Sequence, residues 1–305
     1  MLEMDDFKPI ELIDKDIFSR QYQKNPPQHS DYCFTTMVSW KSFMGYYYAI
    51  IEDILVIMTK LDGKTRFRPP IGAPSQVFDK RVIELAIEYG GESPFGMIDN
   101  DSKKRLSSYF PKLMFQPHRD YFDYVYLASD LVDLKGKEYI KIRNMINRFK
   151  RRFEYKVENI TNDNLEEVIT FLTRWCLWKD CDKVPLLKSE KDAVFYSTEH
   201  FNELDLSGIA IRIHDEIEAI SIFEKLNENT GVIHFEKAIP DFDGLYQVIN
   251  QEAAKILAKD FQFINRESDM GVPGLRTAKT KYRPHHMIEV FHVNKDQLKR
   301  AIDTL

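Results

Sequence analysis

The stretch Ser207–Ile239, SGIAIRIHDEIEAISIFEKLNENTGVIHFEKAI, decides the fold. It is rich in isoleucine, valine and phenylalanine, and polar turn residues interrupt it at His214-Asp215 and at Asn227–Asn229. Short apolar runs that are rich in β-branched residues and bounded by polar turns are typical of strands. A long apolar helix pattern follows at Gly244–Asp260. We therefore predict three antiparallel strands and a covering helix, a layer of the mixed α/β kind.

The same order of elements occurs twice along the 305 residues. In the second half, two helices precede the three strands, and a strand, a helix and a strand follow at Phe261–Glu267, Gly274–Tyr282 and Met287–Val293. The first half repeats helix, helix, strands, helix, strand and helix, although the halves share negligible identity. We predict two tandem domains, 1–124 and 125–305, each a mixed and mostly antiparallel sheet flanked by helices.

A basic helix is predicted at residues 135–152, next to the boundary between these domains. From Lys135 to Lys156 there are nine Lys or Arg and two Glu, about +7, in a chain whose formal net charge is -5. Apolar residues at spacings of three and four predict one buried face. The opposite side carries candidates for contacts with phosphate, because guanidinium and amide groups suit phosphate oxygens: Lys141, Arg143, Asn144, Asn147, Arg148 and Arg151. The alternative is an ordinary solvated helix face.

Several functional classes find no support in the sequence. The chain has no P-loop, no G-x-G-x-x-G motif and no G-x-S-x-G elbow. Its three cysteines lack the paired spacing of a zinc site, and we expect no metal. The acidic start, MLEMDDF, lacks the apolar core of a signal peptide, and no apolar run is long enough to span a bilayer. We expect a cytoplasmic protein.

Charged residues gather in the stretch NRESDMGVPGLRTAKTKYRPHH, Asn265–His286. It follows a predicted buried strand, and α/β sheets usually bind ligands beyond strand ends. Arg266, Glu267 and Asp269 would lie at that end, with Arg276 and Lys279 on the next helix. We expect the two carboxylates to face a cation and the two helix cations to face an anion. The alternative is a capped helix with exposed cations and local ion pairs.

Three blocks of the sequence resemble one family. They are Asp123–Phe149, Phe235–Ala254 and Ile264–Pro284, the last reading INRESDMGVPGLRTAKTKYRP. Together they resemble the C-terminal domain of phosphatidylglycerol lysyltransferases and its relatives. The resemblance implies two tandem GNAT-like domains related to the Fem-type aminoacyl transferases, in agreement with the duplicated element order.

The resemblance also implies the chemistry, which is direct transfer of an acyl or aminoacyl group to an amine or hydroxyl without a covalent enzyme intermediate. Such a reaction needs a positioned acceptor, a proton acceptor and donors for the oxyanion. On this basis we assign Glu236, Lys279 and Tyr282 as catalytic candidates, with Arg276 as a further cation for the oxyanion or leaving group. The substrate-binding candidates are Arg266, Glu267, Asp269, Arg276, Tyr246 and Asn250.

The donor and the acceptor stay open at this point. We expect no tightly bound cofactor, with aminoacyl-tRNA or acyl-CoA as co-substrate and a small molecule, peptide or lipid as acceptor. The loop Ile239–Tyr246 carries Asp241 and Asp243, which would repel the pyrophosphate of CoA. The loop Arg66–Ser75 offers Arg66 and Arg68 and is the better anion site by composition. We favour aminoacyl-tRNA; the alternatives are an acyl-CoA-dependent N-acyltransferase and a non-catalytic binding module on a transferase fold.

Overall fold

The computed structural model describes residues 1–61 and 63–302, which divide into two compact units. Unit one contains Met1–Phe122, Ser268–Val272 and the C-terminal residues from Ile288. Unit two contains Asp123–Glu267 and Pro273–Met287. The predicted domains were 1–124 and a continuous 125–305, so the sequence placed the C-terminal segment with the second domain, whereas the compact units place it with the first.

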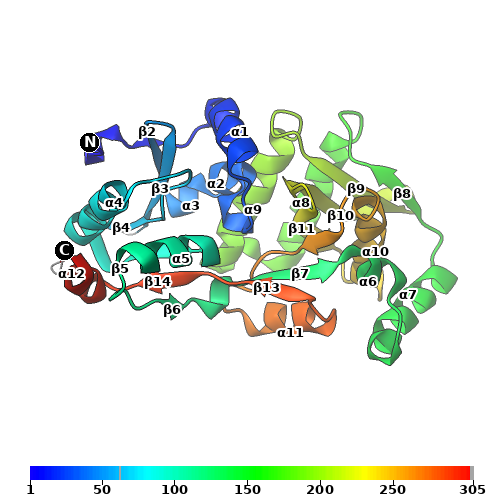
Figure 1. Ribbon diagram of the computed structural model, residues 1–305. Helices are drawn as coiled ribbons and strands as arrows, with labels where there is room; N and C mark the ends of the chain where they lie inside the picture. The colour runs from blue at the N-terminus through cyan, green and yellow to red at the C-terminus, as the bar shows by residue number, and fades with distance from the viewer. Residues whose placement is uncertain (62, 303–305) are drawn as a thin grey trace. The chain divides into compact units, whose positions relative to one another are not determined.

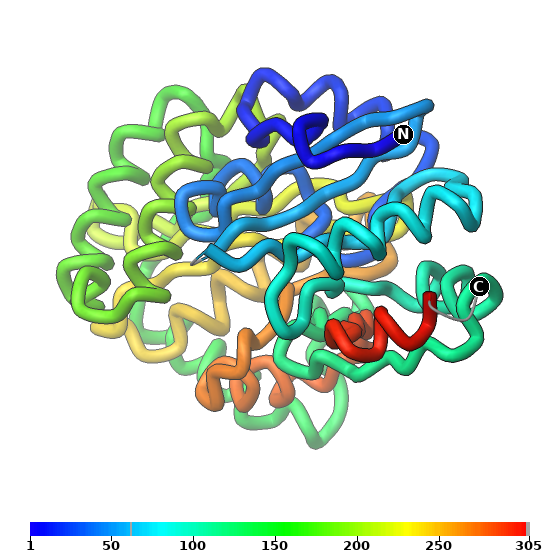
Figure 2. The backbone as a smooth tube through the Cα atoms, turned by 90° about the vertical axis from the view of Figure 1, so that its left-hand side faces the viewer, coloured from blue at the N-terminus to red at the C-terminus, as the bar shows by residue number. Residues whose placement is uncertain are grey.

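Unit one is built on a seven-stranded sheet, with the strand order β1-β2-β3-β4-β5-β14-β6. The pair β4–β5 is parallel, and the other pairs are antiparallel. Its C-terminal helix α12 packs against α4 and β5, and Figure 2 shows this red helix beside the cyan and green segments. The strands are β1 (Lys8–Pro9), β2 (Tyr46–Ile51), β3 (Ile54–Leu61), β4 (Lys64–Phe67), β5 (Gly90–Ile98), β6 (Gln116–Pro117) and β14 (Phe291–Val293). The α-helices are α1 (Lys15–Lys24), α2 (Phe34–Ser39), α3 (Lys41–Met44), α4 (Gln76–Tyr89), α5 (Asn100–Tyr109) and α12 (Lys295–Ile302).

Unit two is built on a second seven-stranded sheet, with the order β13-β7-β12-β11-β10-β9-β8. Here β11–β12 is the parallel pair. The strands are β7 (Asp123–Leu127), β8 (Lys156–Asn159), β9 (Ser207–Ile213), β10 (Glu216–Asn227), β11 (Thr230–Ala238), β12 (Phe263–Asn265) and β13 (His286–Ile288). The α-helices are α6 (Ala128–Asp133), α7 (Ile140–Arg152), α8 (Leu165–Lys179), α9 (Pro185–Glu199), α10 (Leu245–Leu257) and α11 (Pro273–Lys281).

The two sheets repeat one plan and exchange one strand each. Strands β1 to β5 of unit one correspond in order to β8 to β12 of unit two, with the parallel pair at the same place. The sixth strand of each sheet follows, in the chain, a strand of the other sheet. Strand β7 follows β6 in the chain but joins the sheet of unit two, and β14 follows β13 but joins the sheet of unit one (Figure 1). The prediction of two mixed, mostly antiparallel sheets with the same order of elements is confirmed.

The core of unit two explains how the local sequence forms these elements. Alternate residues of β9, among them Ile209, Ile211 and Ile213, lie against Val248 and Ile249 of α10. Helix α7 places its predicted apolar side in the same core, with Tyr139, Ile142, Ile146 and Phe149 buried and Phe153 partly buried. The sheet and α10 thus form a rigid support for the strand ends.

One predicted strand is wrong. The sequence indicated a single strand over Met287–Val293, but β13 ends at Ile288 and β14 begins at Phe291. The two pieces pair in different sheets. An alternating pattern identifies which face of a strand is buried, and it does not identify the sheet that the strand joins.

Candidate functional site

The candidate site lies in unit two, where the parallel strands β11 and β12 stop pairing. Their register runs from Thr230–Phe263 to Val232–Asn265, and β12 ends there. Strand β11 continues to Ala238, and no strand of the described residues pairs with it on that side beyond Val232. Residues 233–238 of β11 therefore face the segment that leaves β12, which begins with Arg266 and Glu267.

A β-bulge in β11 divides the polar residues between the two faces of the sheet. Phe235 pairs with Ile222 of β10 and Ile233 pairs with Phe223, so His234 is the extra residue. A bulge of this kind reverses the alternation of side chains along the strand. Glu236, which pairs with Ser221, consequently lies on the face covered by α10, whereas His234 lies on the opposite face.

Glu236 is the centre of a buried polar cluster on the α10 face. Arg266 donates to its Oε2 from Nη2 at 2.7 Å and from Nε at 3.2 Å. Asn250 of α10 donates from Nδ2 to Oε1 at 3.1 Å and to Oε2 at 3.3 Å. Only 11% of the Glu236 side chain and 16% of the Arg266 side chain are exposed. The sequence named all three residues, and the structure brings them together.

Two tyrosines hold the Arg266 guanidinium. Its carbon lies 4.9 Å from the ring centroid of Tyr282 and 5.8 Å from that of Tyr126, within the range of cation–π contacts. Burial alone would lower the pKa of Arg266, but Glu236 and the two tyrosines raise it above its ordinary value. Burial raises the pKa of Tyr282 to about 12. Arg266 is thus a permanent cation, and Tyr282 is a protonated support rather than a base at neutral pH.

Three polar atoms of this cluster have unused hydrogen-bonding capacity. Arg266 Nη1, Asn250 Oδ1 and Ser221 Oγ are buried and have no hydrogen-bond partner within residues 1–61 and 63–302. Each belongs either to a residue bonded to Glu236 or to its partner in the ladder. Buried polar groups in native proteins are almost always hydrogen-bonded to protein or ordered water. These three atoms are therefore available to water or to a bound polar molecule.

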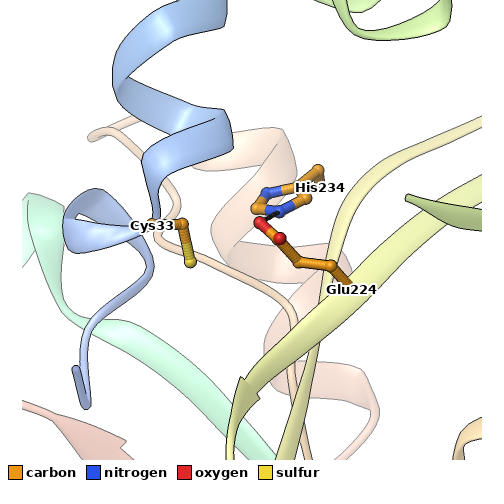
Figure 3. A group of neighbouring side chains, drawn as sticks. All are labelled: Cys33, Glu224 and His234. Atoms are coloured by element: carbon orange, nitrogen blue, oxygen red, sulfur yellow. Dashed lines mark hydrogen bonds and ion pairs between the residues drawn. The ribbon is translucent and has the colours of Figure 1, made fainter. Parts of the chain in front are cut away.

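On the opposite face, His234 is held between two carboxylates. Its Nδ1 lies 2.8 Å from Glu267 Oε1, and its Nε2 lies 2.8 Å from Glu224 Oε1 of β10; Figure 3 shows the ring beside Glu224. Burial would lower the pKa of His234, but the two carboxylates raise it to about 10. The ring is therefore an imidazolium at neutral pH. The predicted cation for Glu267 is thus a residue of the protein.

Lys279 of α11 donates hydrogen bonds to the backbone that follows β12. Its Nζ donates to the carbonyl oxygens of Arg266 and Glu267, the latter at 3.1 Å. Burial lowers the pKa of Lys279 to about 8, while Glu267 acts in the opposite direction. The expectation that Lys279 faces an anion is wrong for this structure, because carbonyl oxygens take up the ammonium group.

The remaining substrate-binding candidates are dispersed. Tyr246, in the first turn of α10, is 40% exposed and accepts a hydrogen bond from Trp175 Nε1 at 3.3 Å. Arg276 lies on α11 and is partly exposed. Asp269 belongs to unit one, where its buried carboxylate pairs with Arg119 at 3.3 Å and accepts the Gly271 N–H at 2.9 Å. Asp269 therefore faces a cation as predicted, but the cation is Arg119.

The basic helix α7 keeps part of its cationic face exposed. Arg148 pairs with Asp243 at 2.8 Å, so one of the carboxylates thought to repel pyrophosphate is neutralised. Arg143 donates to the carbonyl oxygens of Leu134 and Gly136, and it therefore caps the end of α6. Of the six phosphate candidates on this helix, four are exposed and have no ion pair in the described chain: Lys141, Asn144, Asn147 and Arg151.

The loop Arg66–Ser75 was the better anion site by composition. Its two arginines, Arg66 and Arg68, bond to backbone carbonyls within unit one. Arg68 is 3% exposed, donates to the Asp31 carbonyl at 2.7 Å, and lies over the rings of Tyr32 and Tyr46. Arg66 Nε donates to the Ser93 carbonyl at 3.1 Å. Arg68 is therefore a core residue, and its composition-based assignment to phosphate is not supported by its position.

His234, Glu224, Ser221 and Tyr126 were missed by sequence reasoning. A signal existed for His234 and Glu224, because each is an ionisable residue that interrupts an apolar run of a predicted strand, GVI before His234 and AISIF before Glu224. Ser221 and Tyr126 gave none, since a serine or tyrosine in a strand is ordinary.

The family-model comparison matches residues 23–294 to "Phosphatidylglycerol lysyltransferase, C-terminal". The chain belongs to this family. A curated relative, an uncharacterised protein of Mycoplasmoides gallisepticum, is 24% identical over 179 residues, which cover 58% of this chain and 57% of the relative. The match thus spans little more than half the length of that relative.

Solved structures agree with the fold. A Bacteroides thetaiotaomicron protein of unknown function is 30% identical with a TM-score of 0.86, covering 94% of this chain and 98% of its own. The C-terminal domain of a putative lysylphosphatidylglycerol synthetase from Agrobacterium fabrum is 12% identical with a TM-score of 0.63, covering 95% and 96%. FemX is 9% identical with a TM-score of 0.54, covering 97% and 99%. The family is named for a lysyltransferase, so the chain belongs to a family of transferases. No helix in the described part of the chain is long and apolar enough to cross a membrane.

Proposed function

We propose that this chain transfers an aminoacyl group from aminoacyl-tRNA to an amine or hydroxyl acceptor. The observation that carries the proposal is the buried cluster of Glu236, Arg266 and Asn250, which has three polar atoms without partners in the described chain. An aminoacyl ester offers a carbonyl oxygen to a donor such as Arg266 Nη1 and an α-ammonium group to acceptors such as Asn250 Oδ1. Plain acyl groups lack that ammonium.

The transfer would proceed by direct attack. The acceptor's nitrogen or oxygen bonds to the ester carbon while its proton passes to the Glu236 carboxylate. Arg266 donates to the developing oxyanion, a contact that gains strength as the charge forms. The intermediate then collapses, the bond to the tRNA ribose oxygen breaks, and the proton leaves with that oxygen. The Tyr282 ring supports the Arg266 guanidinium, and the Lys279 ammonium group supports the Arg266 backbone carbonyl.

Two features support tRNA as the donor. The exposed side of α7 presents Lys141, Arg151 and two asparagines, a surface suited to a phosphate backbone. The loop before α10 keeps Asp241, whose carboxylate would repel the pyrophosphate of CoA, while Arg148 neutralises Asp243. Charged tRNA is cytoplasmic, and the proposal therefore places the reaction in the cytoplasm.

The test is a transfer assay with bulk tRNA charged with radiolabelled amino acids. Small-amine, peptide and lipid fractions are offered separately as acceptors. We expect label in a new product that forms with wild-type protein and is absent with Glu236→Gln. Acetyl-CoA is the parallel donor. Product from acetyl-CoA alone would replace this proposal with an acyl-CoA-dependent reaction, and product from neither donor would favour a binding module.

A further inference from the structure

We propose that His234 is a positioning residue, which fixes Glu267 and through it the Arg266 guanidinium. For its kinetic test the inference rests on the proposed function; its structural test does not. Neither His234 nor Glu224 touches the Glu236 cluster, because the bulge at Ile222/Phe223 places them on the other face of the sheet. The chain that leaves β12 offers a route to that cluster, because Glu267 there is bonded to His234 and is the neighbour of Arg266.

The segment that leaves β12 is held at two adjacent residues, and their partners lie on opposite faces of the sheet. Arg266 points to Glu236 on the α10 face, and Glu267 points to His234 on the other. Glu267 has a φ of 58°, the left-handed region that residues other than glycine seldom adopt. Its N–H donates to Asn265 Oδ1 at 2.7 Å. An unusual backbone conformation next to the key arginine needs an anchor, and the Glu267 side chain has one in His234.

The backbone contacts carry this anchoring to Arg266. The Arg266 N–H donates to the Tyr124 carbonyl at 2.9 Å, and the Tyr124 N–H donates to the Glu267 carbonyl at 3.2 Å. Lys279 holds the same two carbonyls, those of residues 266 and 267. If His234 released Glu267, the left-handed turn would be free to relax, and Arg266 would lose its alignment with Glu236.

The inference changes the role of Glu267. The sequence made it a substrate-binding residue that holds an ammonium group. In the structure His234 already supplies the cation, at 2.8 Å. Glu267 therefore acts through the backbone and not on the substrate. A neutral, isosteric amide at this position keeps a hydrogen-bonding oxygen toward the ring, whereas it could not neutralise a substrate ammonium.

The kinetic test compares His234→Ala, Glu267→Ala, the double variant and Glu267→Gln, with Glu228→Ala as an exposed control in the same β10–β11 hairpin. We expect each alanine variant to lower kcat about 10²-fold with KM for charged tRNA unchanged, as for a misplaced catalytic group. The double variant should be no worse than either single one. Glu267→Gln should keep most of the activity. Multiplying losses, or a Glu267→Gln variant as poor as Glu267→Ala with a raised KM, would overturn the proposal.

The structural test is hydrogen exchange, which needs no activity. In His234→Ala and Glu267→Ala we expect faster exchange at the amides of Tyr124, Arg266 and Glu267, with β9 unchanged. Unaltered exchange at these amides would refute the positioning role, whatever the activity. If His234→Ala does not fold, the two Glu267 variants decide the question. Faster exchange in a protein that transfers no aminoacyl group would uphold the positioning role and reject the proposed function.

Discussion

Unit one and unit two share a strand order but use the space after the parallel pair differently. In unit one the last parallel pair, Phe67–Phe95, is apolar, and β4 is followed by Arg68 and two prolines. In unit two β11 continues past its last parallel pair and carries His234 and Glu236. Proline has no N–H and cannot extend a hydrogen-bonded ladder. Strand β4 therefore ends at Phe67, whereas β11 continues to Ala238. The two units thus share one plan, and the polar residues beyond the last parallel pair lie in unit two.

Both units nevertheless bury an arginine–carboxylate pair. In unit one, Arg105 of α5 donates to the two oxygens of Asp79 of α4 at 3.0 and 3.2 Å and also to the Pro70 carbonyl. That pair joins two helices. The Arg266–Glu236 pair joins two strand ends beside atoms with unused bonding capacity. The contrast sets an ion pair between two helices against the ion pair of the candidate site, and it supplies matched variants.

The largest expected effect is on activity. Glu236→Gln should lower kcat/KM for aminoacyl transfer by about 10²–10⁴-fold, the usual range for loss of a proton acceptor. Asp79→Asn, the matched change in unit one, should leave kcat/KM unchanged in protein that remains folded. The measurement is the transfer assay at saturating acceptor, with circular dichroism as the check of folding. Equal losses from both changes would abolish the distinction between the units.

The next effect is on stability and should be alike in both units. Arg266→Ala leaves the Glu236 carboxylate buried and unpaired, which costs about 3–5 kcal/mol of unfolding free energy. Arg105→Ala does the same to Asp79, whose side chain is fully buried. Urea unfolding followed by hydrogen exchange in each unit measures both. A harmless Arg266→Ala would mean that Glu236 finds another partner or takes up a proton.

A smaller effect distinguishes two histidines of opposite charge state. Burial, helped by His292 and Arg66, lowers the pKa of His118 in unit one to about 4, whereas His234 in unit two has a pKa of about 10. The unfolded value for both is about 6.5. The contribution of His234 to stability is therefore complete below pH 6.5 and is lost as pH rises through about 10. The contribution of His118 is complete above pH 6.5 and is lost as pH falls through about 4.

Imidazole chemical shifts across pH 4–10 check both histidines directly, and unfolding curves of His234→Gln and His118→Gln check the linkage. Each variant should lack the dependence of the unfolding free energy on pH that its own histidine contributes. The pKa of Lys279 is lowered to about 8, so above that pH Lys279 makes the unfolding free energy rise with pH, whereas His234 makes it fall. Comparing each variant with wild type at the same pH removes the contribution of Lys279. A His234 ring that titrates near pH 6.5 would show that its carboxylate partners are not engaged.

The smallest effect concerns the exposed face of α7. Lys141→Ala with Arg151→Ala should change stability by less than about 0.5 kcal/mol each. The pair should reduce the salt dependence of tRNA binding by about one unit of log–log slope per residue. Arg20→Ala with Lys112→Ala in unit one is the charge-matched control and should not change the slope. Filter binding at several salt concentrations is the measurement; equal effects of the two pairs would indicate non-specific attraction.

The sequence was informative where periodicity determines structure. The three strands of Ser207–Ile239, helix α10 and the buried side of α7 follow from apolar spacing, and the structure confirms them. The contact between His234 and Glu267 could not be predicted, because it depends on a one-residue bulge that reverses the alternation. The role of Lys279 was misread for a related reason. A pattern shows that a cation lies on a helix, but it does not show that two backbone carbonyls are within its reach.

The exchange of β7 and β14 affects the order in which the chain can fold during synthesis. Every strand of the second sheet lies between residues 123 and 288. The first sheet needs β14, which ends at Val293, to fill the position between β5 and β6. The half that leaves the ribosome first is therefore completed last. Until then β5 presents an unpaired edge, an aggregation hazard that a ribosome-bound chaperone would have reason to cover.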